Sequence, residues 1–179
     1  MKRFSIILCI FILSLLMVET TTAQRGGVRP SLKASVSQTL GTETNITISY
    51  CRPGVKGRKI WGVLVPYGAT WRAGANENTT IEFSTDATIE GKKIAAGKYG
   101  VHIIPSESTW IIAFSTKNDG WGSFAYKKEE DALRITVTPK TAPHQEWLSF
   151  GFEDLAGTSA TVFLHWEELK APFKVEVAK

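Results

Sequence analysis

The residues best suited to chemistry lie between Arg52 and Glu77. No acidic residue stands between Glu43 and Glu77, so this stretch has a local charge of +5 from Arg52, Lys56, Arg58, Lys59 and Arg72. An arginine side chain presents a planar fork of donors that binds carboxylate, sulfate or phosphate through two points. The composition therefore favours an anion-binding segment.

Aromatic rings and glycines accompany these cations. Trp61, Tyr67 and Trp71 offer flat apolar faces on which a sugar or an aromatic ring can stack. Glycines recur through the segment and allow its backbone to approach a ligand closely. The predicted ligand is an anionic small molecule or a glycan. The predicted ligand-binding residues are Arg52, Arg58, Trp61, Trp71, Arg72, Asn76 and Glu77.

The same residues also allow a purely structural interpretation. A long loop leaves many backbone carbonyls unpaired, and one arginine can satisfy several of them. The arginines could also pair with acids under the loop, at Glu77, Glu82 or Asp86, while the tryptophans fill core. The sequence leaves both interpretations open.

Catalysis has less support, and no catalytic residue is predicted. The pair Asn76-Glu77 resembles the acid/base carboxylate of some glycosidases, but such enzymes need a second carboxylate nearby. Neither a GxSxG elbow nor a GxxxxGK[ST] phosphate loop occurs. The alternative function is therefore a small hydrolase or lyase acting on polysaccharide or cell-envelope substrate, with Glu77 and His102 as its reactive groups.

Neither a metal nor another cofactor is predicted. The motifs HxH, HExxH and CxxC are absent from the chain. A minor alternative places His102 and His165 on one sheet face, where Glu167 could complete a metal site. Cys51 is expected to be a small buried apolar residue and not a nucleophile, because no histidine stands near it in sequence.

The N-terminal residues predict export. Lys2 and Arg3 precede an apolar run from Phe4 to Val18 and a small-residue site ending at Ala23, which is the pattern of a secretory signal peptide. That run is shorter than the roughly 18 residues of a membrane span. We therefore predict a signal peptide at 1–23, a single β-sandwich domain at 24–179, a periplasmic or secreted location, and no membrane span after signal removal.

The formal net charge of +4 is modest, and acids are mixed among most of the lysines. Because the chain has neither a Lys/Arg block nor a recognisable nucleic-acid motif, nucleic acid is not a predicted partner. The oligomeric state is left unknown.

Short runs of alternating apolar and polar residues flank the Arg52–Glu77 segment and must position it. Alternation of apolar and polar residues, bounded by Gly or Pro, predicts half-buried strands. Such runs are found at 34–40, 45–51, 80–83, 99–103, 110–114, 133–137, 147–152, 160–166 and 173–177, with a hairpin around Glu90-Gly91. Since no window has a sustained helical period, the predicted fold is an all-β, antiparallel two-sheet sandwich, jelly-roll-like, of about ten strands with one long Gly/Arg/Trp-rich loop.

Five motifs resemble the DUF2911 family, exported bacterial proteins that share a domain of unknown function. They are Tyr50–Pro53, Lys56–Gly62, Val65–Gly68, Trp71–Glu77 and Ala96–Tyr99, and the likeness runs from about Pro30 to the C-terminus. The resemblance implies export from a Gram-negative cell, a β-rich domain, and a signature in which Arg52, Arg58, Trp71, Arg72 and Asn76 act as a unit. Members usually carry Ser where Cys51 stands, which further implies that the thiol is dispensable.

Overall fold

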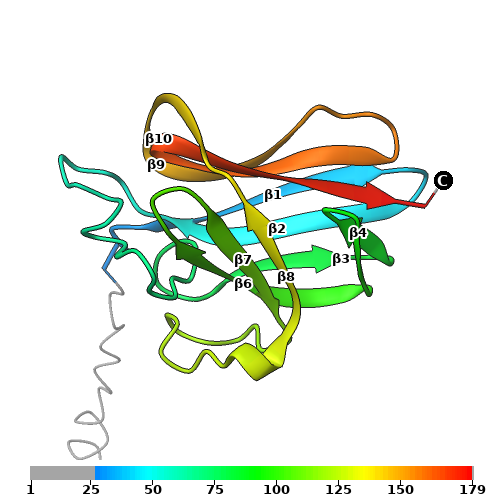
Figure 1. Ribbon diagram of the computed structural model, residues 1–179, viewed down its shortest axis with the longest axis horizontal. Helices are drawn as coiled ribbons and strands as arrows, with labels where there is room; N and C mark the ends of the chain where they lie inside the picture. The colour runs from blue at the N-terminus through cyan, green and yellow to red at the C-terminus, as the bar shows by residue number, and fades with distance from the viewer. Residues whose placement is uncertain (1–26, 179) are drawn as a thin grey trace, which may run out of the picture.

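The chain folds into two antiparallel β-sheets packed face to face (Figure 1). The computed structural model describes residues 27–178, so the predicted signal peptide at 1–23 lies outside the described residues. The strands are β1 (Leu32–Leu40), β2 (Thr44–Arg52), β3 (Thr79–Phe83), β4 (Ala87–Ile89), β5 (Lys92–Ile94), β6 (Gly97–Pro105), β7 (Trp110–Ser115), β8 (Asp131–Val137), β9 (Lys140–Glu153) and β10 (Ser159–Val177). A 3-10 turn, η1 (Lys128–Glu130), precedes β8. The predicted all-β sandwich is confirmed.

One sheet has six strands in the order β1-β2-β3-β6-β7-β8, and the other has four in the order β5-β4-β10-β9. The predicted hairpin is also confirmed, because Ile89 pairs with Lys92 across a two-residue turn. Both turn residues, Glu90 and Gly91, have positive φ angles of 48° and 73°. Positive φ at both positions matches the right-handed twist of the strands that the turn joins.

The core lies between the sheets and includes a cluster of four tryptophans. Trp61 packs 4.4 Å from Trp110 and 6.0 Å from Trp166 between ring centroids, and Trp71 stacks on Trp166 at 5.8 Å. Trp110 and Trp166 come from strands of opposite sheets, while the other two come from the loop after β2. The loop tryptophans therefore tie the segment of interest to both layers.

The last third of the chain differs from the prediction. Residues 160–166 and 173–177 were expected to form separate strands, but they belong to one strand, β10. β10 pairs with β9 as far as Lys170 and with β4 from Val175 onward. Pro172 lies between these two pairings, so its missing N–H removes no ladder hydrogen bond and the strand continues through it.

The segment between β2 and β3 is ordered although it contains no strand. Isolated β-bridges join Gly54 to Trp147 and Trp71 to Ile103. Five of its apolar residues are buried, namely Val55, Ile60, Trp61, Val65 and Ala73, whereas Val63 and Leu64 are exposed. The loop extends past the end of the two sheets in Figure 1 and closes that end of the core.

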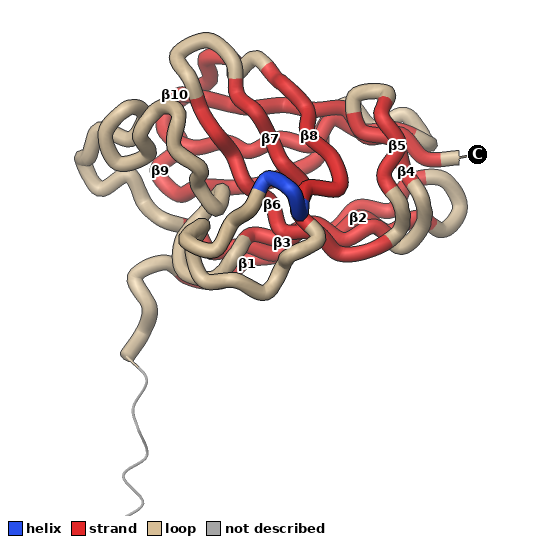
Figure 2. Tube along the Cα trace, turned by 60° about the horizontal axis from the view of Figure 1, so that its bottom comes forward, coloured by secondary structure: helices blue, strands red, loops and turns tan. Residues whose placement is uncertain are grey.

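A second loop, residues 116–127, covers the outer face of the six-stranded sheet. Figure 2 shows it with the blue helical turn in front of β6. Between 27 and 178 the chain forms no helix that is both long and apolar enough to cross a membrane.

Candidate functional site

The loop after β2 borders a hollow of about 280 Å³, which we name the basic hollow. It is lined by Pro30, Ser31, Pro53, Gly54, Lys56, Arg58, Leu64, Val65, Trp71, Arg72, Gly74, Ala75 and Trp166. Three of these residues are cationic, and none of them is acidic. Three of the five cations predicted from the sequence thus surround one concave surface.

Arg72 is the most unusual of the three cations. Its Nε is buried and has no hydrogen-bond partner, and no ion pair joins Arg72 to an acid in residues 27–178. Burial lowers the pKa of the Arg72 guanidinium because desolvation disfavours its charged form. Partial burial of a charge without an ionic partner is costly, so an anion beside Arg72 would offset part of that cost.

Two indole N–H groups near Arg72 also have no acceptor. Trp166 lines the hollow, and its Nε1 is buried without a partner. The Nε1 of Trp61, whose ring contacts that of Trp166, is in the same state. By contrast, Trp71 donates its Nε1 hydrogen to the carbonyl of Gly74 at 3.1 Å. Buried donors normally have partners, so the region has a deficit of acceptors.

Arg52 and Arg58 have clear structural contacts. Arg52 donates from Nε to the carbonyl oxygen of Leu148 at 2.8 Å and thereby joins β2 to β9. Arg58 donates from Nε to the carbonyl oxygen of Val55 at 3.0 Å and folds back onto its own loop. Arg58 still lines the basic hollow, whereas Arg52 does not.

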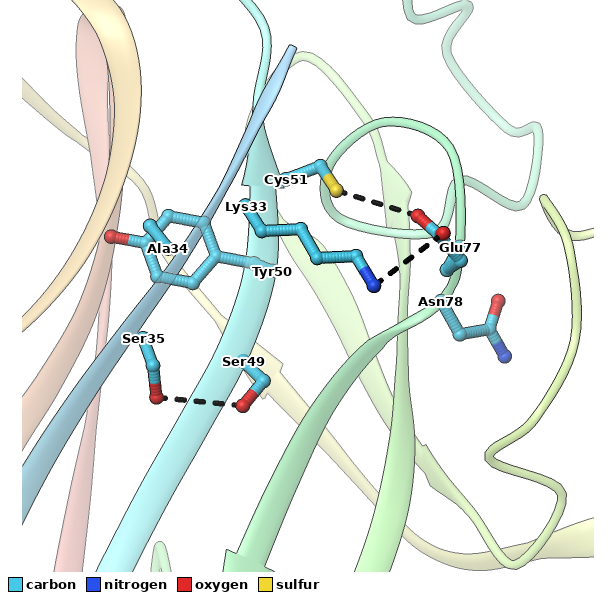
Figure 3. Close-up of a pocket in the computed structure, with 8 residues that line it drawn as sticks. All are labelled: Lys33, Ala34, Ser35, Ser49, Tyr50, Cys51, Glu77 and Asn78. Carbon is cyan, nitrogen blue, oxygen red and sulfur yellow. Dashed lines mark hydrogen bonds and ion pairs between the residues drawn. The ribbon is translucent and has the colours of Figure 1, made fainter. Parts of the chain in front are cut away.

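Glu77 lies outside the basic hollow, in a second depression of about 430 Å³ that we name the outer groove. Figure 3 shows Lys33 and Cys51 pointing toward its carboxylate. Nζ of Lys33 lies 3.6 Å from Oε1 of Glu77, and Sγ of Cys51 lies 3.5 Å from Oε2. Hydrogen bonding from Arg29 is the main cause that lowers the pKa of Glu77 to about 2. So acidic a carboxyl is a weak proton acceptor at neutral pH, which disfavours it as a general base.

Asn76 builds the end of the loop. Its backbone has a φ of 59°, a left-handed conformation that asparagine tolerates better than most residues. Its Nδ2 donates to the carbonyl oxygen of Ser31 at 3.2 Å, and its own carbonyl accepts from the backbone N–H of Gly122. Asn76 therefore connects the loop to both the N-terminal residues and the 116–127 loop.

Cys51 is buried in the floor of the outer groove, with only 3% of its surface exposed. Burial raises the pKa of its thiol, so the reactive thiolate is disfavoured. We expect Cys51, in a chain that begins at Gln24 and so lacks Cys9, to react with Ellman's reagent at least about 100-fold more slowly when native than when unfolded in urea. Equal rates in the two states would contradict this placement.

The two mid-strand histidines are not neighbours. His102 lies in β6 of the six-stranded sheet and His165 in β10 of the other, so the metal site suggested for them with Glu167 is wrong. Within residues 27–178 no group of three His, Cys, Asp or Glu side chains is placed to hold a metal ion. His102 instead contacts Ser123, with 2.9 Å between Nδ1 and Oγ.

Of the predicted binding residues, the structure brings Arg58, Trp71 and Arg72 together around the hollow. Trp61 packs behind them against Trp71, while Arg52, Asn76 and Glu77 lie elsewhere. Sequence reasoning missed Trp166 and the N-terminal Pro30 and Ser31, which line the same hollow. These residues are far in sequence from Arg58 and Arg72, so no local pattern indicated that they would lie around the same hollow.

Comparison with known proteins finds a family match. The model of a family described as "Protein of unknown function (DUF2911)" matches residues 31–175, which is most of the chain. No curated protein and no solved structure matches it.

Proposed function

The chain belongs to the DUF2911 family of proteins of unknown function, and we propose that it is a non-catalytic domain, exported as its N-terminal sequence predicts, that binds a small anion in the basic hollow. The ligand class is a molecule carrying a carboxylate, sulfate or phosphate, acidic sugars included. The observation that carries this proposal is Arg72, a partly buried cation that lines a hollow without acids and whose buried Nε has no partner.

The donors around the hollow support an oxygen-rich anion. The Arg72 guanidinium supplies a charged donor, and charged hydrogen bonds are stronger than neutral ones. Lys56 and Arg58 add positive potential at the rim, where both are exposed. A site with many donors and no acid rejects cations and favours anions.

The size of the hollow limits the ligand. Small-molecule sites usually enclose about 300 to 1,000 Å³, and this hollow lies just below that range at about 280 Å³. It suits one charged group on a body the size of a single ring. Trp71 and Trp166 provide the apolar wall against which such a ring can pack.

The hydrolase alternative has weaker support. The pKa of Glu77, about 2, keeps the carboxyl ionised and weakly basic, so it could neither donate a proton nor accept one readily near pH 7. Its carboxylate is also engaged by Arg29.

Calorimetry with sulfate, phosphate, acetate and glucuronate at constant ionic strength tests the proposal. We expect at least one of these anions to bind, and Arg72→Met to weaken that binding about tenfold or more, because a charged hydrogen bond contributes about 1.5 to 3 kcal/mol. Lys59→Ala is the matched control: Lys59 is an exposed cation of the same segment that does not line the hollow. Equal binding by wild type and a folded Arg72→Met variant would refute the proposal.

A further inference from the structure

One wall of the basic hollow comes from the start of the described chain. Residues 27–31, named here the N-terminal arm, precede β1, and two of them, Pro30 and Ser31, line the hollow. The arm contributes no strand, and its residues 27–30 are exposed. Its position therefore depends on a few side-chain contacts and not on sheet pairing.

Two of those contacts converge on the residue just before Pro30. Nη1 of Arg29 is 2.5 Å from Oε1 of Glu77, and the guanidinium carbon lies 5.9 Å from the centroid of the Trp121 ring. Glu77 and Trp121 stand side by side because a β-bridge joins their backbones. A carboxylate next to an aromatic face is a suitable receptor for a guanidinium.

A third contact holds the arm at Ser31. Asn76 donates from Nδ2 to the carbonyl oxygen of Ser31 at 3.2 Å. Asn76 and Glu77 end the same loop whose earlier residues, Arg58 and Arg72, line the hollow. The arm is thus fastened to the segment that it helps to enclose.

We propose that Glu77 and Trp121 form a clasp for Arg29, and that this clasp holds the N-terminal arm as a wall of the basic hollow and so controls how tightly the hollow retains an anion. The inference rests on the proposed function. Opening the clasp frees Pro30, exposes the hollow to water and speeds ligand release. Because Arg29 and Trp121 are half exposed or more, the clasp is weak enough to open and close.

The first test observes the arm without any ligand. Backbone ¹⁵N relaxation of Val28, Arg29 and Ser31 is measured in wild type, Glu77→Gln and Trp121→Ala. We expect restricted amides in wild type and clearly faster motion in both variants. Lys33→Ala is the matched control, because Lys33 also faces Glu77, at 3.6 Å, but belongs to β1 and should leave the arm unchanged.

The second test measures anion affinity. With the anion that binds best, Glu77→Gln and Arg29→Ala should weaken binding about three- to tenfold, the range expected from losing an exposed ion pair and a cation–π contact. The swap Arg29→Glu with Glu77→Arg should recover part of the loss, since it restores an opposite-charge pair.

The outcomes separate the two proposals. If no anion binds wild type, the proposed function fails, and the relaxation data alone decide whether the clasp exists. If an anion binds in an Arg72-dependent way but Glu77→Gln leaves both arm motion and affinity unchanged, the clasp is refuted and the binding site stands. Should Glu77→Gln fail to fold, Arg29→Ala, which changes only an exposed arm residue, decides the same question.

Discussion

Replacing Arg52 with alanine is expected to lower the free energy of unfolding by about 3 kcal/mol, whereas replacing Arg72 with methionine is expected to leave it unchanged or raise it. Arg52 donates to the carbonyl oxygens of Leu148 and Trp147, at 2.8 Å and 3.4 Å. Removing it takes the donor from the Leu148 carbonyl and cuts a tie between β2 and β9, although the Trp147 carbonyl still accepts from Nε2 of Gln145 at 3.0 Å.

Arg72 should behave in the opposite way because its charge is partly buried and its Nε has no partner. Methionine keeps much of the side-chain volume, packs against the indole rings and removes the desolvation cost of the cation. A residue that lowers stability yet favours a ligand is typical of a binding site.

Urea denaturation of both variants, with no added anion, checks this pair of expectations. Arg52→Ala should shift the midpoint to lower urea concentration with little change in slope, and Arg72→Met should not. A large loss of stability in Arg72→Met would show that Arg72 is structural and would remove the main support for the anion site.

The free energy of unfolding should rise by about 3 kcal/mol between pH 4 and pH 7, as a contribution from His102 alone. Burial lowers the pKa of His102 to about 4 from an ordinary value of 6.5. The unfolded chain thus takes up a proton at a higher pH than the native protein does. The stability contributed by neutral His102 is complete above pH 6.5 and is lost as the pH falls toward 4.

The surroundings of His102 explain why its neutral form is favoured. Its ring contacts Ser123 through Nδ1 and packs 4.6 Å from the ring of Tyr126. Tyr126 in turn donates to Asp131, whose pKa is raised by burial. A raised carboxyl pKa acts with the opposite sign, because it gives stability at low pH that is lost as the pH rises.

Comparison of variants therefore isolates the histidine. His102→Gln should remove the rise between pH 4 and pH 7 in urea or thermal denaturation, relative to wild type. His144→Gln, which replaces a histidine that is 51% exposed, should keep it. If His102→Gln shows the same pH profile as wild type, His102 is not held neutral by burial.

The sequence predicted the strands well because alternation is a local signal. Residues such as Ile46, Ile48 and Tyr50 face the core at every second position of β2, as their spacing indicated. It failed at β10, where Pro172 was taken to end a strand. Whether a proline interrupts a strand depends on which neighbour needs its N–H, and that neighbour lies far away in the chain.

The amino-acid sequence by itself determined the all-β class, the family and the concentration of positive charge between Arg52 and Arg72, since composition and period are properties of adjacent residues. Only the tertiary structure decided which of those cations hydrogen-bond to backbone carbonyls and which line a cavity. Arg52 and Arg72 are the same residue type on the same segment, yet one meets carbonyls of β9 and the other has an unpartnered Nε beside Trp166. Burial and partners depend on contacts between distant parts of the chain, so the chemistry of each arginine is set by the packing of two sheets and not by its neighbours in sequence.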